Sequence, residues 1–198
     1  VARQDRASTG PALEAFARKS ASFVMTDWLN LASLQLVSGD APAAKATLDL
    51  ARQSPSWQPA SLTEPDHVRM GYSASIAVAG IELAAGNRSA AIGILDALDR
   101  TLDKVELGGA ACGGLYALRA HSRALRGDPE GAMTFLRRAH EKGWREARAA
   151  RVEPYLQVLR DRPDFRQLLE FCHTHDEAAR GGKEFPPRCE LFIRVLKI

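Results

Sequence analysis

The sequence has few cysteines, few aromatic residues and no long apolar run. Its 198 residues include 3 cysteines and 7% aromatic residues, beside 45% hydrophobic and 26% charged residues. No stretch approaches the roughly 20 consecutive apolar residues that cross a bilayer, so we expect no membrane span. The N-terminus shows no apolar signal-peptide core. The hydrophobic content excludes a disordered chain and is sufficient for one substantial core.

The cysteine pattern excludes a dense disulfide framework, because Cys112, Cys172 and Cys189 are odd in number and widely spaced. We expect free thiols, with a bridge between Cys172 and Cys189 as the alternative. Residues 172–176 read Cys-His-Thr-His-Asp, but a zinc site needs four ligands at defined spacing, and no second Cys/His pair lies nearby.

Cys112 lies in the glycine-rich segment 108–114, which has no Gly-Lys-Ser/Thr ending of a phosphate-binding loop and no family signature of a nucleophile. We interpret these glycines as a break between two helices. We therefore predict no metal site, no cofactor and no catalytic residue, and we expect that the chain is not an enzyme.

One short pattern occurs three times along the chain: a Gly-Asp or Gly-Asn break followed, at a fixed distance, by a small residue, a leucine and an apolar residue. The breaks lie at residues 39–40, 86–87 and 127–128. Glycine takes the left-handed conformation that ends a helix, Asp or Asn caps the next helix, and Pro42 and Pro129 suit a first helical turn. The repeat predicts helical hairpins stacked in series.

Alanines recur where the two helices of each hairpin would touch, and small side chains there let helix axes approach closely. The pairs are Ala32 with Ala44, Ala79 with Ala91, and Ala120 with Ala132.

The order aromatic, Leu, small, Gly-Asp, Ala, large apolar, Ala resembles the tetratricopeptide repeat. The first unit matches through Trp28, Leu31, Ala32, Gly39, Asp40, Ala44, Leu48 and Ala51, and the third through Tyr116, Ala120, Gly127, Asp128, Ala132, Leu136 and Ala139. The second unit has Ser75 for the aromatic residue and Leu98 for the last alanine. The breaks are more widely spaced than the ~34-residue period of that family. The resemblance implies an all-α fold, a right-handed stack of antiparallel helical hairpins with a C-terminal capping helix.

We expect one repeat domain over residues 1–180, with units at 25–54, 68–104 and 111–143. The capping segment 144–173 resembles the end of repeat regions attached to bacterial winged-helix transcription regulators, nucleotide cyclases and kinases. It predicts a short turn or helix followed by a helix that begins at Pro163. Residues 181–198 form a C-terminal tail that is apolar enough to pack on the body or to dock to a partner.

The resemblance implies a concave groove lined by the first helix of each unit. We expect in it Asn30, Ser33, Val37, Ser73, Ile76, Gly80, Ala117 and His121. This set is small and mostly neutral, and it lacks the Lys/Asn/Arg residues with which some relatives hold a C-terminal carboxylate. It favours a protein or peptide partner of apolar character, or the chain's own tail. His121 is the groove residue that can change charge near neutral pH.

The net charge of +3 is unevenly distributed, with acidic residues prevailing up to Glu106 and arginines from Arg119 to Arg166. The arginine-rich region lacks interleaved aromatic residues and contains carboxylates, so we expect no direct nucleic-acid binding. Asp96, Asp99 and Asp103 share one helix face, where we expect a solvated acidic surface.

These features predict a non-catalytic protein-interaction or sensory scaffold that belongs to a larger bacterial signalling or transcription-regulatory protein. The alternative is an accessory domain that positions a catalytic domain absent from this sequence. The chain begins at Val1 inside a helical pattern, so we interpret it as a fragment. Its location is unassigned: the cytoplasm is favoured, and the periplasm applies if the parent protein is anchored in a membrane.

Overall fold

The computed structural model describes residues 24–57, 70–109, 111–144 and 146–180. All regular structure in this part of the chain is helical, which confirms the predicted all-α class. The helices, in order, are α2 (Met25–Val37), α3 (Ala41–Gln53), α4 (Met70–Ala84), α5 (Arg88–Leu107), α6 (Gly113–Leu125), α7 (Pro129–Glu141), α8 (Ala147–Val152), the 3-10 helix η3 (Pro154–Leu159) and α9 (Pro163–Arg180).

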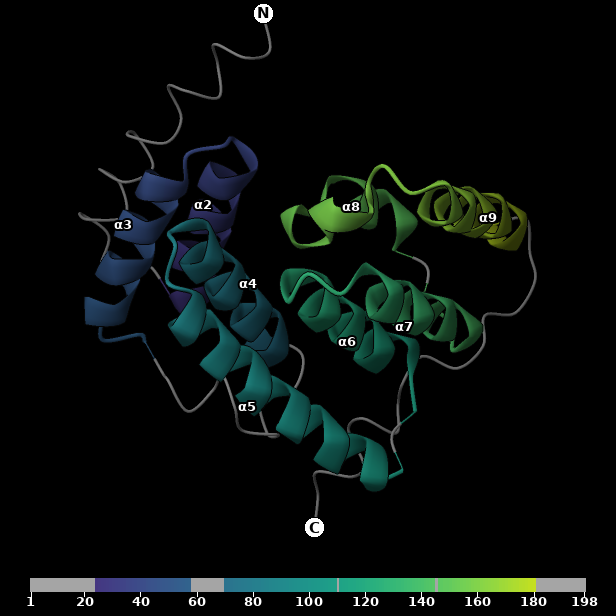
Figure 1. Ribbon diagram of the computed structural model, residues 1–198, viewed down its shortest axis with the longest axis horizontal. Helices are drawn as coiled ribbons and strands as arrows, with labels where there is room; N and C mark the ends of the chain where they lie inside the picture. Colours follow the sequence, from purple (N-terminus) through teal and green to yellow (C-terminus); the bar gives the residue numbers. More distant parts are fainter. Residues whose placement is uncertain (1–23, 58–69, 110, 145, 181–198) are drawn as a thin grey trace, which may run out of the picture.

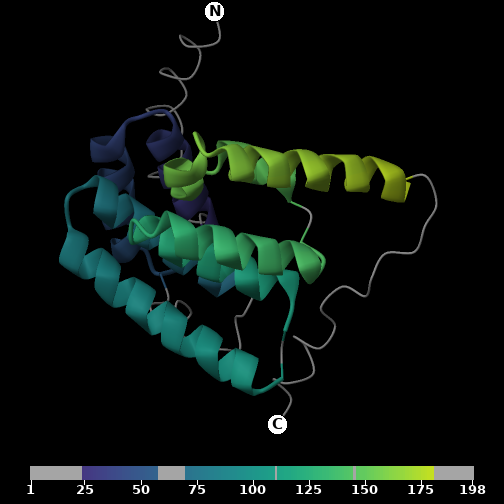
Figure 2. The same cartoon turned by 45° about the vertical axis from the view of Figure 1, so that its right-hand side comes forward.

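Three helical hairpins form the body of the molecule. They are α2–α3, α4–α5 and α6–α7, and the two helices of each pair pack closely against one another. The first helices of the hairpins also lie in a row, since α4 contacts both α2 and α6. Helix α9 begins at Pro163, as predicted, and packs against α7 and α8 (Figures 1 and 2).

The turns between paired helices have the predicted glycine chemistry. Gly39 has a φ of +85°, and Gly86 and Gly127 take the same left-handed conformation. At the first break the amides of Gly39 and Asp40 donate to carbonyls in the last turn of α2, at 3.0 and 2.9 Å. These bonds satisfy carbonyl groups that the end of a helix otherwise leaves without a partner.

The predicted capping role is confirmed at two breaks and wrong at the third. The Asp40 carboxylate accepts from the Ala43 amide at 3.0 Å, and the Asp128 carboxylate accepts from the Gly131 amide at 2.9 Å. The Asn87 side chain makes no such bond. It donates instead to a carboxylate oxygen of Glu82 at 2.7 Å, because that buried acid lies within its reach.

The alanines predicted to meet within hairpins are fully buried: Ala32, Ala44, Ala79, Ala91, Ala120 and Ala132. Around them, a smaller apolar cluster joins the first two hairpins and includes Leu48 and Ile81. A larger cluster runs from α4 to α9 and includes Tyr116, Leu156 and Phe165. The last two hairpins therefore share one core with η3 and α9.

A buried carboxylate links the first and second hairpins. Glu82 of α4 has an exposed fraction of 2%, and its carboxylate lies 2.7 Å from the guanidinium of Arg52 on α3. A buried charge is tolerated only where it is paired and hydrogen-bonded. Arg52 and Asn87 together meet this requirement.

The acidic face of α5 differs from the prediction of a merely solvated surface. Arg126, directly after α6, lies 2.7 Å from Asp96 and 3.0 Å from Asp99, and Arg119 of α6 lies 2.8 Å from Asp103. Asp96 and Asp103 remain exposed to solvent as expected, but the acids are also paired, because α6 folds back alongside α5 and brings arginines to them. The charge imbalance along the sequence thus becomes ion pairing between neighbouring hairpins.

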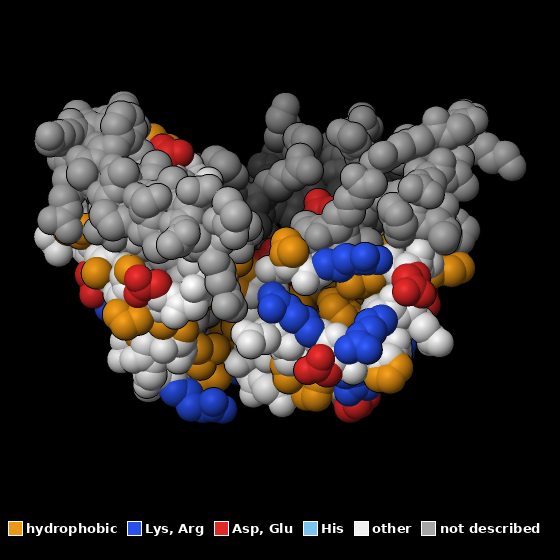
Figure 3. Space-filling model, turned by 90° about the horizontal axis from the view of Figure 1, so that it is seen from above, with side chains coloured by type: hydrophobic (Ala, Val, Ile, Leu, Met, Phe, Trp, Pro, Cys, Tyr) orange, Lys and Arg blue, Asp and Glu red, His pale blue; other side chains and the backbone are white. Residues whose placement is uncertain are grey.

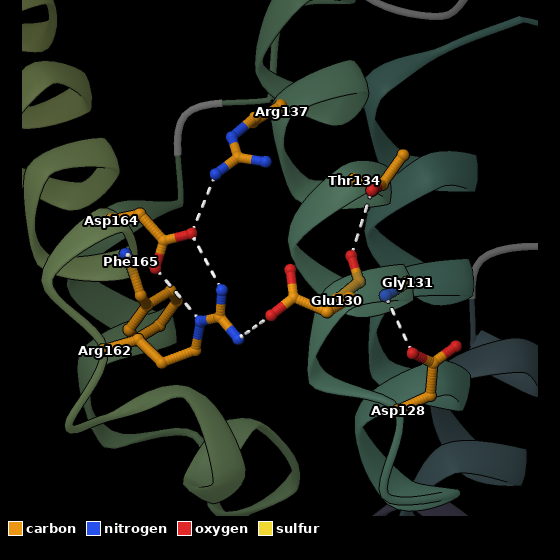
Figure 4. A network of polar contacts seen from close by, with 8 residues as sticks. All are labelled: Asp128, Glu130, Gly131, Thr134, Arg137, Arg162, Asp164 and Phe165. Carbon is orange, nitrogen blue, oxygen red and sulfur yellow. Dashed lines mark hydrogen bonds and ion pairs between the residues drawn. The ribbon is translucent and has the colours of Figure 1, made fainter.

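A second group of ion pairs fixes the start of α9 against α7 (Figure 4). Arg162 donates to both oxygens of Asp164, at 3.0 and 3.1 Å, and also contacts Glu130 on α7. Arg137 of α7 donates to Asp164 at 2.8 Å. The hydrogen bonds from Arg162 hold the pKa of the Asp164 carboxyl below its usual value. Arg137 and Glu130 are exposed and Arg162 and Asp164 are half-buried, so the pairs add little stability.

Candidate functional site

The predicted groove surface is covered in part by the chain itself. We call the faces of α2, α4 and α6 that carry Ser33, Gly80 and Ala117 the inner surface. Helix η3 contacts all three of these first helices. The capping segment was expected at the end of the hairpin series, and its η3 portion instead packs across the inner surface.

Tyr155 is the residue through which η3 holds the inner surface. Its side chain has an exposed fraction of 8%, and its hydroxyl lies 2.9 Å from the hydroxyl of Ser33 on α2. Its ring lies against Gly80 of α4, where a β-carbon would come within 2.4 Å of a ring carbon. Burial raises the pKa of Tyr155 to about 12, and the Ser33 hydrogen bond opposes that shift. Because glycine has no side chain, Gly80 leaves a slot on α4 that the Tyr155 ring fills.

Replacement of Gly80 by alanine tests this slot. We expect the free energy of unfolding to fall by about 1–2 kcal/mol, because the clash with Tyr155 outweighs the better helix propensity of alanine. Amide hydrogen exchange of residues 154–159 should become faster. The matched control is Gly93→Ala on α5, where a β-carbon meets no atom within 4 Å. Equal stability and exchange in the two variants would show that the slot does not hold η3.

The remaining predicted groove residues lie in different surroundings. Asn30 is exposed on α2, whereas Ile76 and Ala117 are buried within the larger core cluster. Val37 is partly exposed at the end of α2. Ser73 lies in α4, and its side chain is outside the described part of the structure.

His121 is a half-buried residue of α6. Its Nδ1 donates to the Ala117 carbonyl at 2.7 Å. Burial lowers the pKa of the His121 imidazole, because the cationic ring loses water. The ring is therefore neutral at pH 7, and protonation requires a more acidic medium than for a histidine in water.

A hollow of about 320 Å³ opens where the inner surface ends, and we call it the α2–η3 hollow. One wall is the end of α2 and the turn after it, and the other is α8, η3 and the residues that flank them. Its lining consists of Leu36, Val37, Gly39, Arg151, Val152, Pro154, Gln157 and Arg160. Seen from the top of Figure 1, Lys and Arg side chains surround hydrophobic side chains over the region of α8 and η3 (Figure 3).

The two arginines of the hollow differ in how they are held. Arg160 donates at 3.2 Å to the backbone carbonyls of Val152 and Glu153, so its position is fixed by neutral acceptors. Arg151 is exposed and makes no hydrogen bond or ion pair with another described residue. Burial and the nearby Glu146 raise the pKa of the Glu153 carboxyl, while Arg160 opposes the shift.

The residues weighed for chemistry lie apart from one another. Cys112 precedes α6, and Cys172 is fully buried in the core. Cys189, the alternative bridge partner of Cys172, lies outside the described residues, as does the rest of the tail 181–198. Among the described residues no group of three or more His, Cys, Asp or Glu side chains is placed to hold a metal ion. The same part of the chain has no helix with the length and apolar character of a membrane span.

The sequence missed Tyr155, Arg151 and Arg160 as residues of the site. They were assigned to a capping segment, since no periodicity indicates which face such a segment covers. One signal was present: Gly80 interrupts an apolar helix, and an isolated glycine there indicates a close approach of another group. The sequence could thus have marked the slot without identifying the ring that fills it.

No family model, no curated protein and no solved structure matches this chain.

Proposed function

We propose that this chain is a non-catalytic protein-interaction or sensory scaffold of tetratricopeptide-like hairpins in a right-handed stack. In this proposal the part of the inner surface that η3 leaves uncovered and the α2–η3 hollow beside it bind a peptide segment of another protein. The wider setting that we propose is the one predicted from the sequence, a bacterial signalling or regulatory protein.

The observation that carries this proposal is the way in which the inner surface holds η3. Six residues of the same chain, Pro154–Leu159, lie against three helices. Tyr155 enters a slot at Gly80 and meets Ser33, while Leu156 and Leu159 are fully buried. An aromatic anchor in a pocket with a hydrogen bond at its end is how interfaces recognise peptides. The surface is thus complementary to a short peptide-like segment.

The arrangement of charge also supports a protein partner rather than a nucleic acid. Arg119, Arg126, Arg137 and Arg162 each contact a carboxylate of a neighbouring helix. Nucleic-acid binding relies on cations that are available to phosphate groups. Most described arginines of the arginine-rich region from Arg119 to Arg166 instead form ion pairs within the protein.

Selection from a random peptide display library tests the proposed function. We expect enriched peptides with a shared motif that compete with one another for the purified chain. Their binding should be weakened by Val37→Asp, which changes an apolar residue of the hollow lining, and unaffected by Leu107→Asp. Leu107 is an exposed apolar residue at the end of α5, and it provides the matched control. The proposal fails if no peptide is enriched, or if both substitutions affect binding equally.

A further inference from the structure

We infer that the α2–η3 hollow takes an acidic–aliphatic peptide segment, in which one or two large aliphatic side chains lie beside a carboxylate, from another protein. This inference rests on the proposed function and specifies the chemistry of its partner. It follows from the apolar walls, from the two arginines of the lining, and from the charge of the chain's own ends.

The apolar walls of the hollow are exposed on both sides. Val37 at the end of α2 has an exposed fraction of 45%, and Val152 at the end of α8 has one of 65%. Leu36 and Pro154 are the other apolar side chains of the lining. Burying these side chains against a ligand is favourable because it removes apolar surface from water. The volume of about 320 Å³ is at the lower end of the roughly 300–1,000 Å³ range of ligand pockets, which suits a few side chains.

The two arginines of the hollow differ from the other arginines of the arginine-rich region in their ion pairing. Of the described arginine side chains between residues 119 and 166, all but Arg151 and Arg160 lie within 4.0 Å of a carboxylate. No Asp or Glu lines the hollow. Arg160 is oriented by backbone carbonyls, and it interacts electrostatically with Glu153 without forming an ion pair with it. A carboxylate of a ligand would therefore find two guanidinium groups that form no ion pair with a described carboxylate.

The chain's own ends have the wrong charge for this role. Residues 181–198 contain Lys183, Arg188, Arg194 and Lys197 but only Glu184 and Glu190 as acids, and residues 1–23 also have more basic than acidic residues. Like charges next to Arg151 and Arg160 disfavour both segments. Charge complementarity therefore favours a segment of another protein over the tail that the sequence suggested.

Fluorescence anisotropy on the full chain tests the inference with defined probes. The main probe is a fluorescein-labelled peptide Glu-Glu-Leu-Leu-Glu-Glu. Three matched probes carry Gln in place of Glu, Lys in place of Glu, or Ser in place of Leu. We expect the acidic leucine probe to bind most tightly, and its affinity to fall as salt concentration rises because ionic attraction is screened.

Two exposed substitutions assign binding to the hollow. Arg151→Glu should weaken binding of the acidic leucine probe by about tenfold or more, and Val152→Ser should also weaken it. Arg100→Glu is the matched control, since Arg100 is exposed on α5, which lies on the opposite side of the molecule from α8 in Figures 1 and 2. Circular dichroism checks that each variant remains folded.

Several outcomes would overturn the inference. They are no binding of the acidic leucine probe, equal binding of the Gln or Lys probe, and equal effects of Arg151→Glu and Arg100→Glu. A peptide of residues 181–198 that competes for the hollow more strongly would assign it to the tail. A single-stranded oligonucleotide that binds in its place, with loss on Arg151→Glu, would assign it to nucleic acid. The proposed function survives any of these results if library selection still yields peptides that depend on Val37.

Discussion

Replacement of Gly113 by alanine is expected to lower the free energy of unfolding by about 3 kcal/mol or more. A β-carbon at Gly113 would lie 2.5 Å from the backbone nitrogen of Trp144 and 2.8 Å from the carbonyl oxygen of Ala139. Both are backbone atoms, one in the last turn of α7 and one in the turn that follows it, so neither can move as a flexible side chain would. The Gly113 amide also donates to the Lys142 carbonyl at 3.1 Å, and the displacement would break this bond. Urea denaturation followed by circular dichroism measures the loss.

Gly114 provides a matched control in the same turn of α6. It is exposed, and a β-carbon there meets no atom within 4 Å. Gly114→Ala should therefore raise stability by up to about 1 kcal/mol, the usual difference in helix propensity between the two residues. Equal stabilities of the Gly113 and Gly114 variants would contradict the packing of α6 on the end of α7.

Gly113 and Gly114 show which features of the glycine-rich segment could be predicted from the sequence. The segment 108–114 was predicted to break one helix from the next, and the structure has α5 ending at Leu107 and α6 beginning at Gly113. Composition cannot distinguish two adjacent glycines. Only the fold brings Trp144 to one of them, because α7 returns along α6 to the start of that helix.

Reversal of the charge at Arg119 is expected to have the other large effect. Its side chain is mostly buried and lies 2.8 Å from both Asp103 and Glu106, and its guanidinium also lies 5.8 Å from the ring centre of Phe135. Arg119→Glu should lower the free energy of unfolding by about 3–5 kcal/mol, because it buries a carboxylate beside Asp103 and Glu106 and leaves Glu106 with only Arg138 and Tyr116 as described partners. Thermal and urea denaturation at low and high salt measure the change.

Two further variants separate charge from packing at this position. Arg119→Met keeps an unbranched side chain against Phe135 without adding a carboxylate, so its loss should be smaller, about 1–2 kcal/mol. Arg100→Glu changes an exposed arginine of α5 and should alter stability by no more than about 0.5 kcal/mol. If Arg119→Glu were as mild as Arg100→Glu, the pairing between α5 and α6 would not contribute to stability.

Only those residues of the candidate site that lie on α2 and α4 could be predicted from the sequence. Ser33, Val37 and Gly80 follow from helical periodicity and the position of each break, and the structure places them beside η3 or in the hollow. Tyr155 and the hollow arginines come from a distant part of the chain: Ser33 and Tyr155 are 122 positions apart. No local pattern encodes a contact over that separation.

The sequence by itself determined the helices, their glycine breaks, two of the three caps and the alanines buried within each hairpin. These features depend on backbone conformation and on neighbours within a few turns, which local residue patterns encode. Tertiary structure alone decided that the acids of α5 meet arginines, that Gly113 and Gly80 accept other groups at close range, and that η3 covers the inner surface. Each of these follows from packing between distant segments, where buried area and charge pairing outweigh local preference. The same packing places Arg151 and Arg160 in the lining of the α2–η3 hollow.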